Sequence, residues 1–202
     1  MRLLLLVLSS ALGLLAMGLL AGCGGDGATP TTTAAAATTT AAATTTTSTL
    51  PVSHAAPDLE ALLPGSLGGR PLEKGSTTGT AVLSGGDAFS REMNRILAAA
   101  GKDPGDLRFA NAQDPSGVLE LEVGVFQVEG MPSAKLRAAI VQSSRPNAPG
   151  LQVSRDRLGG RPVTSVVYPG GAALYLYAQG DRVFYVGTQS RATAAKVLRQ
   201  LP

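Results

Sequence analysis

The chain divides into three regions by its pattern of apolar and polar positions. After Met1 and Arg2, residues 3–22 form an almost continuous apolar run, broken only by Ser9, Ser10 and three glycines. Residues 24–57 consist largely of alternating Thr and Ala blocks and lack the regularly spaced large apolar side chains of a buried helix or strand. From residue 58 onward, short apolar runs alternate with Gly and Pro, a pattern typical of a folded domain with short elements.

Three amphipathic helices are predicted in the third region. Asp87 is a suitable N-cap for a helix that ends at Gly101, with apolar residues at helical spacing between them. Pro132 opens a second helix that stops before Pro146. Ser190 caps a third near the end of the chain. The inner faces of these helices are Phe89, Met93, Ile96, Leu97 and Ala100, then Leu136, Ala139 and Ile140, then Ala194, Val197, Leu198 and Leu201.

The remaining runs predict strands joined by tight turns. Asp114-Pro115-Ser116-Gly117 has the composition of a type I turn, and Gly159-Gly160 and Gly180-Asp181 suit two-residue hairpin loops. A short helical segment over 58–63 precedes them. The strands are expected at 78–84, 107–112, 118–128, 151–155, 162–168, 172–179 and 182–188.

Hairpins with interposed helices predict an α+β fold, in which an antiparallel sheet has helices packed on it. We expect a single domain over 57–202. The pentapeptide Leu67-Gly68-Gly69-Arg70-Pro71 recurs as residues 158–162. This repeat indicates either two similar turns, which we favour in a glycine-rich chain, or two related halves.

The apolar run at the N-terminus has the layout of a secretory signal, because the single basic residue Arg2 precedes it. It is also long enough for a transmembrane helix, which needs about 20 apolar residues. The sequence Leu20-Ala21-Gly22-Cys23 favours the signal, since it resembles the lipobox of bacterial lipoprotein precursors. The resemblance covers residues 1–23 only. It implies a signal peptide over 1–22, cleavage between Gly22 and Cys23, and a diacylglycerol on the Cys23 thiol.

Residues 23–56 are predicted to be the lipidated cysteine and a disordered Thr/Ala-rich linker. Too few apolar side chains are present to offset the entropy of ordering such a segment. The Thr blocks also resemble O-glycosylated stalks, so glycosylation stays an open alternative. His54 is expected to be an idle solvated side chain in this linker.

Composition narrows the possible chemistry. With one Cys and one His, the chain forms neither an internal disulfide framework nor a Cys/His zinc site. A net charge of +3 over 202 residues is too small to indicate a nucleic-acid partner. No phosphate loop, serine-nucleophile motif or calcium loop is present after residue 57, and we predict no cofactor, metal or catalytic residue.

Glu120 and Glu122 form the one carboxylate pair that suggests catalysis. If both lie on one strand, they project from the same face about 7 Å apart, a separation that serves glycoside hydrolysis. Charges on the solvent face of an amphipathic strand are the ordinary explanation for this spacing.

The four tyrosines all lie in the C-terminal strands, which suggests a binding surface. With Gly180-Asp181 as the turn, Tyr177 faces Phe184 and Tyr175 faces Val186 on one side of the hairpin. An exposed strip of Tyr175, Tyr177 and Phe184 suits recognition of a protein or glycan. The alternative is that a helix or loop covers these rings. Arg155, Arg157 and Arg161 either extend the strip toward an anionic polymer or are simply solvated.

These features predict a protein held by a lipid anchor on the extracytoplasmic side of a bacterial cell membrane. Its domain is expected to be a non-catalytic binding or structural module, with the membrane and an envelope protein or glycan as partners and no nucleic acid. The alternative is a cell-envelope hydrolase that uses Glu120 and Glu122. The ligand and the oligomeric state stay open.

Overall fold

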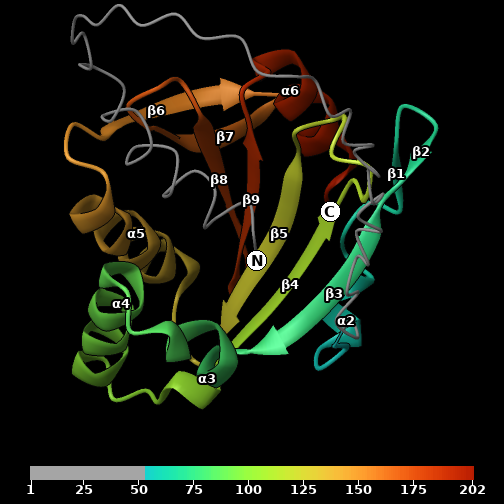
Figure 1. The fold of residues 1–202 in the computed structure, drawn as a ribbon. Helices are drawn as coiled ribbons and strands as arrows, with labels where there is room; N and C mark the ends of the chain where they lie inside the picture. The colour runs from blue at the N-terminus through green and yellow to red at the C-terminus, as the bar shows by residue number, and fades with distance from the viewer. Residues whose placement is uncertain (1–52) are drawn as a thin grey trace, which may run out of the picture.

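The computed structural model describes residues 53–202, which form a seven-stranded antiparallel sheet with helices on both faces (Figure 1). The predictions for the signal peptide, for cleavage and lipidation at Gly22 and Cys23, and for most of the linker lie outside the described residues. The strand order is β3-β4-β5-β9-β8-β7-β6, and every neighbouring pair is antiparallel. The strands are β3 (Glu73–Thr78), β4 (Leu107–Gln113), β5 (Glu122–Val128), β6 (Gln152–Leu158), β7 (Arg161–Val167), β8 (Ala173–Gln179) and β9 (Arg182–Thr188).

The helices divide between the two faces of the sheet. Two of them, α4 (Ala88–Ala99) and α5 (Ser133–Ser144), lie side by side on one face (Figure 1). On the other face lie α2 (Pro57–Glu60) and α6 (Arg191–Gln200). We call these the α4/α5 face and the α2/α6 face.

Strand alternation sends side chains into two separate cores. In β9, Val183 and Tyr185 join the α4/α5 core, whereas Phe184 and Val186 join the α2/α6 core. Successive side chains of a strand point to opposite faces, so a central strand covered on both sides is apolar throughout. The α+β fold with an antiparallel sheet is therefore confirmed.

The predicted helix starts and hairpins also match the structure. The Asp87 carboxylate accepts a hydrogen bond from the backbone N–H of Ser90 at 2.8 Å, and Ser190 Oγ accepts one from Thr193 at 3.2 Å. The hairpins β6–β7 and β8–β9 have the two-residue turns that the sequence predicts.

The predicted strand over 78–84 is wrong. This segment forms α3 (Gly79–Val82) and a following 3-10 turn, and the strand β3 lies just before it. Gly79 packs so closely that a Cβ there would lie 2.2 Å from the Pro104 carbonyl oxygen. The sequence pattern does not indicate β3, because its residues, Glu-Lys-Gly-Ser-Thr-Thr, contain no large apolar side chain.

The strand predicted over 118–128 begins only at Glu122. Asp114 holds the preceding loop, because its carboxylate accepts hydrogen bonds from the backbone N–H groups of Ser116 and Leu119, both at 3.0 Å. Glu120 has a positive φ of 42°. The chain therefore turns where the apolar pattern alone predicts extension.

The repeated pentapeptide marks two turns of the same type. Gly68 and Gly69 have φ values of 60° and 80°, and Gly159 and Gly160 have 60° and 84°. Both turns join short antiparallel pairs, β6–β7 in the large sheet and β1 (Ser66–Leu67) with β2 (Arg70–Pro71) in a small one. Positive φ at both central positions is what a type I′ hairpin requires, and glycine adopts it without steric cost.

The folded part starts before residue 57. Ala56 is buried, and His54 forms a parallel β-bridge with Ser76 on the outer edge of β3. Residues 53–56, at the end of the predicted linker, therefore contact the domain.

Candidate functional site

The two candidate carboxylates do not form a pair. Glu120 is exposed in the loop, whereas Glu122 begins β5 and is 3% exposed beneath the α4/α5 face. The prediction that both project from one solvent face is wrong, because the strand starts after Glu120. This arrangement does not support the hydrolase alternative.

Glu122 instead binds a buried tyrosine. The Tyr185 hydroxyl donates a hydrogen bond to Glu122 Oε1 at 2.5 Å, and the ring lies against Phe109 and Phe126. Gly124 makes room for this ring, since a Cβ there would lie 2.3 Å from Tyr185 Cε1. Burial, together with the nearby Glu122 charge, raises the pKa of Tyr185 well above its usual range.

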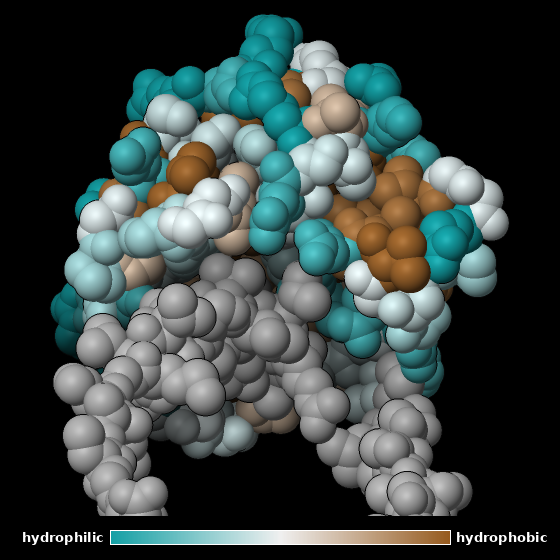
Figure 2. All heavy atoms as spheres, turned by 45° about the horizontal axis from the view of Figure 1, so that its top comes forward, coloured by the Kyte–Doolittle hydropathy of each residue, from teal (hydrophilic) through white to brown (hydrophobic). Residues whose placement is uncertain are grey.

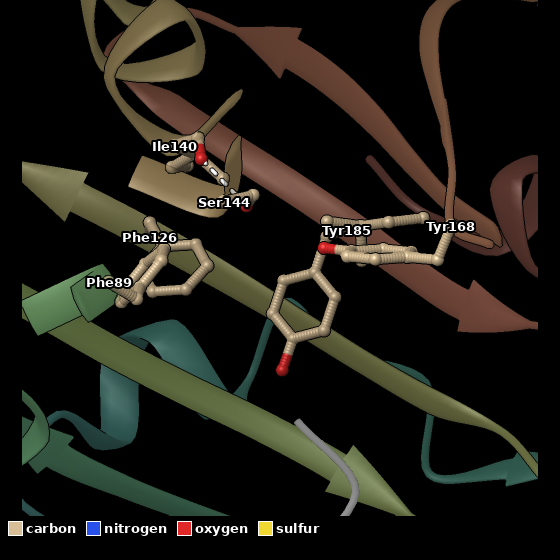
Figure 3. A pocket seen from close by; sticks show the side chains of 7 residues that line it. Phe89, Phe126, Ile140, Ser144, Tyr168 and Tyr185 are labelled. Carbon is tan, nitrogen blue, oxygen red and sulfur yellow. Dashed lines mark hydrogen bonds between the residues drawn. The ribbon is translucent and has the colours of Figure 1, made fainter. Parts of the chain in front are cut away.

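A small cavity lies beside this pair on the α4/α5 face (Figure 3). Phe89, Phe126, Tyr168 and Tyr185 contribute to its lining, and its volume is about 10 Å³. The hydroxyl of Ser144 at its wall donates to the Ile140 carbonyl at 2.9 Å, within the helix. A single water requires roughly this volume, so the cavity is too small for an organic ligand.

The predicted exposed aromatic strip is also wrong. Tyr177 faces Phe184 across the hairpin as expected, with ring centroids 6.1 Å apart. However, Tyr175, Tyr177 and Phe184 are 5%, 9% and 1% exposed. They belong to the core that contains Ala194, Val197 and Leu198 of α6, so the closing helix covers the strip.

Arg161 seals the edge of this covered strip. Its guanidinium lies 4.7 Å from the centre of the Tyr177 ring, and Nη1 donates to the Tyr177 hydroxyl at 2.6 Å. The same guanidinium donates to the carbonyls of Leu201 and Pro202. Arg161 therefore fastens the C-terminal residues to the sheet.

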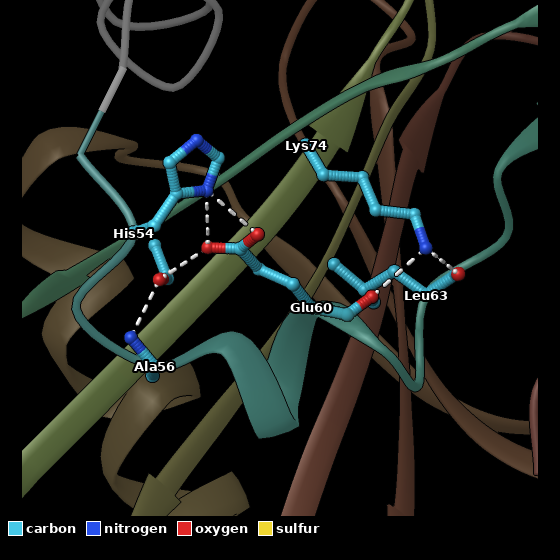
Figure 4. Close-up of polar contacts among 6 residues, drawn as sticks. His54, Ala56, Glu60, Leu63 and Lys74 are labelled. Atoms are coloured by element: carbon cyan, nitrogen blue, oxygen red, sulfur yellow. Dashed lines mark hydrogen bonds and ion pairs between the residues drawn. The ribbon is translucent and has the colours of Figure 1, made fainter. Parts of the chain in front are cut away.

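A polar cluster fastens the first described residues to the opposite edge of the sheet (Figure 4). The Glu60 carboxylate lies 2.8 Å from His54 Nδ1 and accepts a hydrogen bond from Ser76 Oγ at 2.5 Å. Ser76 Oγ in turn accepts the backbone N–H of Ala56 at 2.6 Å. We call His54, Glu60 and Ser76 the N-terminal clamp. The His54 side chain is 58% exposed, as the prediction of a solvated side chain requires, but it is not idle, because it is hydrogen-bonded to Glu60.

Lys74 holds the end of the neighbouring helical segment. Its ammonium donates to the carbonyl oxygens of Glu60 at 2.9 Å and Leu63 at 2.6 Å (Figure 4). These carbonyls lie at and just beyond the C-terminus of α2, where helix carbonyls lack partners within the helix. Sequence spacing does not reveal this cluster, because β3 was not predicted.

The N-terminal clamp contains the residue types of a catalytic triad in the wrong order. In a Ser-His-acid triad the imidazole lies between the hydroxyl and the carboxylate and removes the hydroxyl proton. Here Glu60 lies between His54 and Ser76, and the buried Ser76 hydroxyl donates to the carboxylate. This arrangement suits a structural fastening rather than nucleophilic attack.

The charges are distributed unevenly along the described chain. Residues 131–202 carry ten Lys and Arg against two Asp, whereas residues 53–130 carry six against eleven Asp and Glu. Five exposed cations lie on β6 and α6, which are at the top of Figure 1 and are turned toward the viewer in Figure 2. Arg155 and Arg157 lie on the α4/α5 face of the sheet, whereas the cations of α6 lie on the α2/α6 face. We call the cations of both faces together the basic surface: Arg155, Arg157, Arg191, Lys196 and Arg199.

Over residues 53–202, no group of three or more His, Cys, Asp or Glu side chains is arranged to hold a metal ion. None of the helices in this range is long and apolar enough to cross a bilayer.

The comparisons with known proteins give no relative. No family model, no curated protein and no solved structure matches this chain.

Proposed function

We propose that this protein is a lipid-anchored lipoprotein of the bacterial cell envelope. Its folded domain is then a non-catalytic binding or structural module on the extracytoplasmic side of the membrane. The observation that carries the proposal is the order Leu20-Ala21-Gly22-Cys23 at the end of the apolar run. Two or three acyl chains on one cysteine anchor a protein stably, since each buried CH₂ contributes about 0.8 kcal/mol.

The way the chain joins the domain is compatible with a tether. The backbone N–H of Ser76 donates to the Ser53 carbonyl at 2.8 Å, and the N–H of Ala55 donates to the Ser76 carbonyl at 3.3 Å. Together with the N-terminal clamp, these bonds hold the entering chain against β3. Twenty-nine residues lie between Cys23 and Ser53. As a random coil they would hold the domain about 30 Å from the membrane.

The two edges of the sheet support a division of roles. The preceding chain joins at β3, and β6 with the basic surface lies at the other end of the strand order. A module tethered by one edge presents the other edge away from its attachment. This placement favours the β6 end as the binding side.

The proposal is tested by replacing the lipidated residue. In cells labelled with a palmitate analogue, the wild-type protein and the control Gly25→Ala should carry the label and fractionate with membranes. Cys23→Ala should carry no label, retain its leader and run at a higher mass. If the Cys23→Ala protein is labelled, cleaved and membrane-bound like the wild type, the lipoprotein assignment is wrong.

A further inference from the structure

The two edge strands of the sheet differ in how they are covered. β3 receives the parallel bridge from residues 53–55 on its outer side. β6 ends the strand order, and among residues 53–202 nothing pairs with its outer side. Gln152, Val153, Ser154, Arg155 and Arg157 are all exposed. An open edge of this kind is a template for an added strand.

The register identifies which backbone groups of β6 point outward. Leu158 and Arg161 flank the two-residue turn and so exchange hydrogen bonds, as do alternate pairs along the hairpin. Val153, Arg155 and Arg157 occupy the positions between, where N–H and C=O point away from β7. Pro162, which lies opposite Arg157, is consistent with this hydrogen-bond pattern. Proline has no backbone N–H, and at this position none is needed for a bond between β6 and β7.

One of these outward groups is already occupied. The N–H of Arg157 donates to the Asp156 carboxylate at 2.7 Å. The N–H and C=O groups of Val153 and Arg155 are left to receive a partner strand. Their side chains lie on the same face as Val166 and the α4/α5 core.

The charge along this edge selects the partner. Asp156 is the only acidic residue of β6, and it is paired with Arg191. Arg155 has no ion-pair partner among residues 53–202, and the Arg157 guanidinium donates to the Gly160 carbonyl. An incoming strand therefore meets two arginines, at positions two residues apart on one face.

A second copy of the chain is a poor occupant of this edge. In such a dimer the β6 strands of the two copies would pair antiparallel across a two-fold axis perpendicular to the sheet. If all seven residues of each β6 pair, the axis passes beside the middle residue, Arg155. Arg155 then lies opposite Arg155, and like charges directly opposite destabilise a sheet.

We infer that β6 binds an extended acidic peptide segment of an envelope protein as an additional antiparallel strand. Carboxylates at alternate positions lie opposite Arg155 and Arg157, and the backbone groups of Val153 and Arg155 supply the hydrogen bonds. The inference rests on the proposed role as a binding module but not on the lipid anchor. A failed Cys23 experiment therefore leaves it intact, and its own failure leaves the anchor intact.

The test measures binding of fluorescein-labelled peptides to the detergent-purified full chain by anisotropy. The parent probe alternates glutamate and threonine. In the inferred register the glutamates opposite Val153 and Arg155 turn their N–H groups toward β6, whereas the threonine N–H groups point outward. N-methylation of the glutamates should therefore weaken binding by about tenfold or more, and N-methylation of the threonines should leave it nearly unchanged.

Protein variants separate backbone pairing from charge attraction. Val153→Pro removes one outward N–H without removing a charge or a β6–β7 hydrogen bond. It should weaken binding of the parent peptide about tenfold. Arg155→Glu should weaken binding of the parent peptide at least as much. The charge-matched control Lys196→Glu on α6 should change the affinity less than about twofold.

Several results would overturn the inference. These are no binding of the parent peptide, equal effects of the two N-methylated peptides, and equal effects of Arg155→Glu and Lys196→Glu. The last two would indicate that the basic surface attracts anionic chains by charge alone. The N-methylated peptides probe the wild-type protein, so they decide the matter even if Val153→Pro fails to fold.

Discussion

At the residue scale, polar side chains that are distant in the sequence meet in the N-terminal clamp. Ser76 and Glu60 lie sixteen residues apart, yet they share a hydrogen bond of 2.5 Å and together hold the chain at His54 and Ala56. No spacing rule brings them together, because the contact requires β3 to lie beside α2. In contrast, Glu120 and Glu122 have a suggestive spacing, but Glu120 is exposed in a loop that Asp114 holds, whereas Glu122 is buried at the start of β5.

The N-terminal clamp makes a specific stability prediction. Ser76→Ala removes the acceptor of the buried Ala56 N–H and the donor to Glu60. We expect the free energy of unfolding to fall by about 1–3 kcal/mol, measured by urea denaturation, because a buried donor is left without a partner.

The control for this variant is Ser84→Ala, which removes an exposed serine that bonds only to the Ala81 carbonyl. It should change the free energy of unfolding by less than about 0.5 kcal/mol. Equal losses in the two variants would contradict the importance of the Ser76 contacts.

At the scale of elements, local signals located most helices and hairpins. Asp87 and Ser190 cap α4 and α6, and the glycine turns define β6–β7 and β8–β9. These signals act within a few residues, so they can be recognised without knowing the fold. β3 was missed because its position at the edge, partly covered by residues 53–55, needs little apolar character.

Helix α6 decides the environment of the C-terminal hairpin. Gly159 of the β6–β7 turn touches it so closely that a Cβ would lie 2.6 Å from the Ala195 carbonyl oxygen. Because α6 covers Tyr175 and Tyr177, these rings stabilise the core instead of contacting a partner.

A truncation in α6 should therefore be costly. Leu198 is fully buried, and Leu198→Ala should lower the free energy of unfolding by about 2–5 kcal/mol, measured by urea denaturation. Gln200→Ala, at an exposed position of the same helix, is the control and should have little effect. If Leu198→Ala is as stable as the control, α6 does not close the α2/α6 core.

At the scale of the whole molecule, charge separates the two halves of the described chain. Residues 131–202 are basic and residues 53–130 are acidic, although the net charge of the chain is only +3. The net charge of the whole chain does not reveal this asymmetry. The basic surface on β6 and α6 belongs to the basic half.

Aspartates and tyrosines with shifted pKa values predict how the stability of the domain depends on pH. Hydrogen bonds from Arg108, Ser116 and Arg191 lower the pKa values of Asp58, Asp114 and Asp156, respectively. Their stabilisation is present above the pKa of an unfolded aspartate, about 4, and is lost as the pH falls through the lower folded values. Burial raises the pKa values of Tyr168 and Tyr185, so stability is also lost as the pH rises above about 10.

We therefore expect urea midpoints to be flat between about pH 5 and 9 and to fall on both sides. Asp114→Asn should reduce the fall of the urea midpoint below about pH 5, and Tyr185→Phe should reduce its fall above about pH 9. Stability that rises below pH 4, or tyrosine absorbance at 295 nm that titrates as in the unfolded chain, would contradict this account.

The sequence alone determined the elements whose causes are local: the capped helices, the glycine hairpins and the α+β class. It also carries the whole basis for expecting an anchor at Cys23. The tertiary structure decided the remainder, because burial depends on which elements meet. Only packing placed α6 over the tyrosines, joined residues 53–56 to β3 and left β6 open at the other edge.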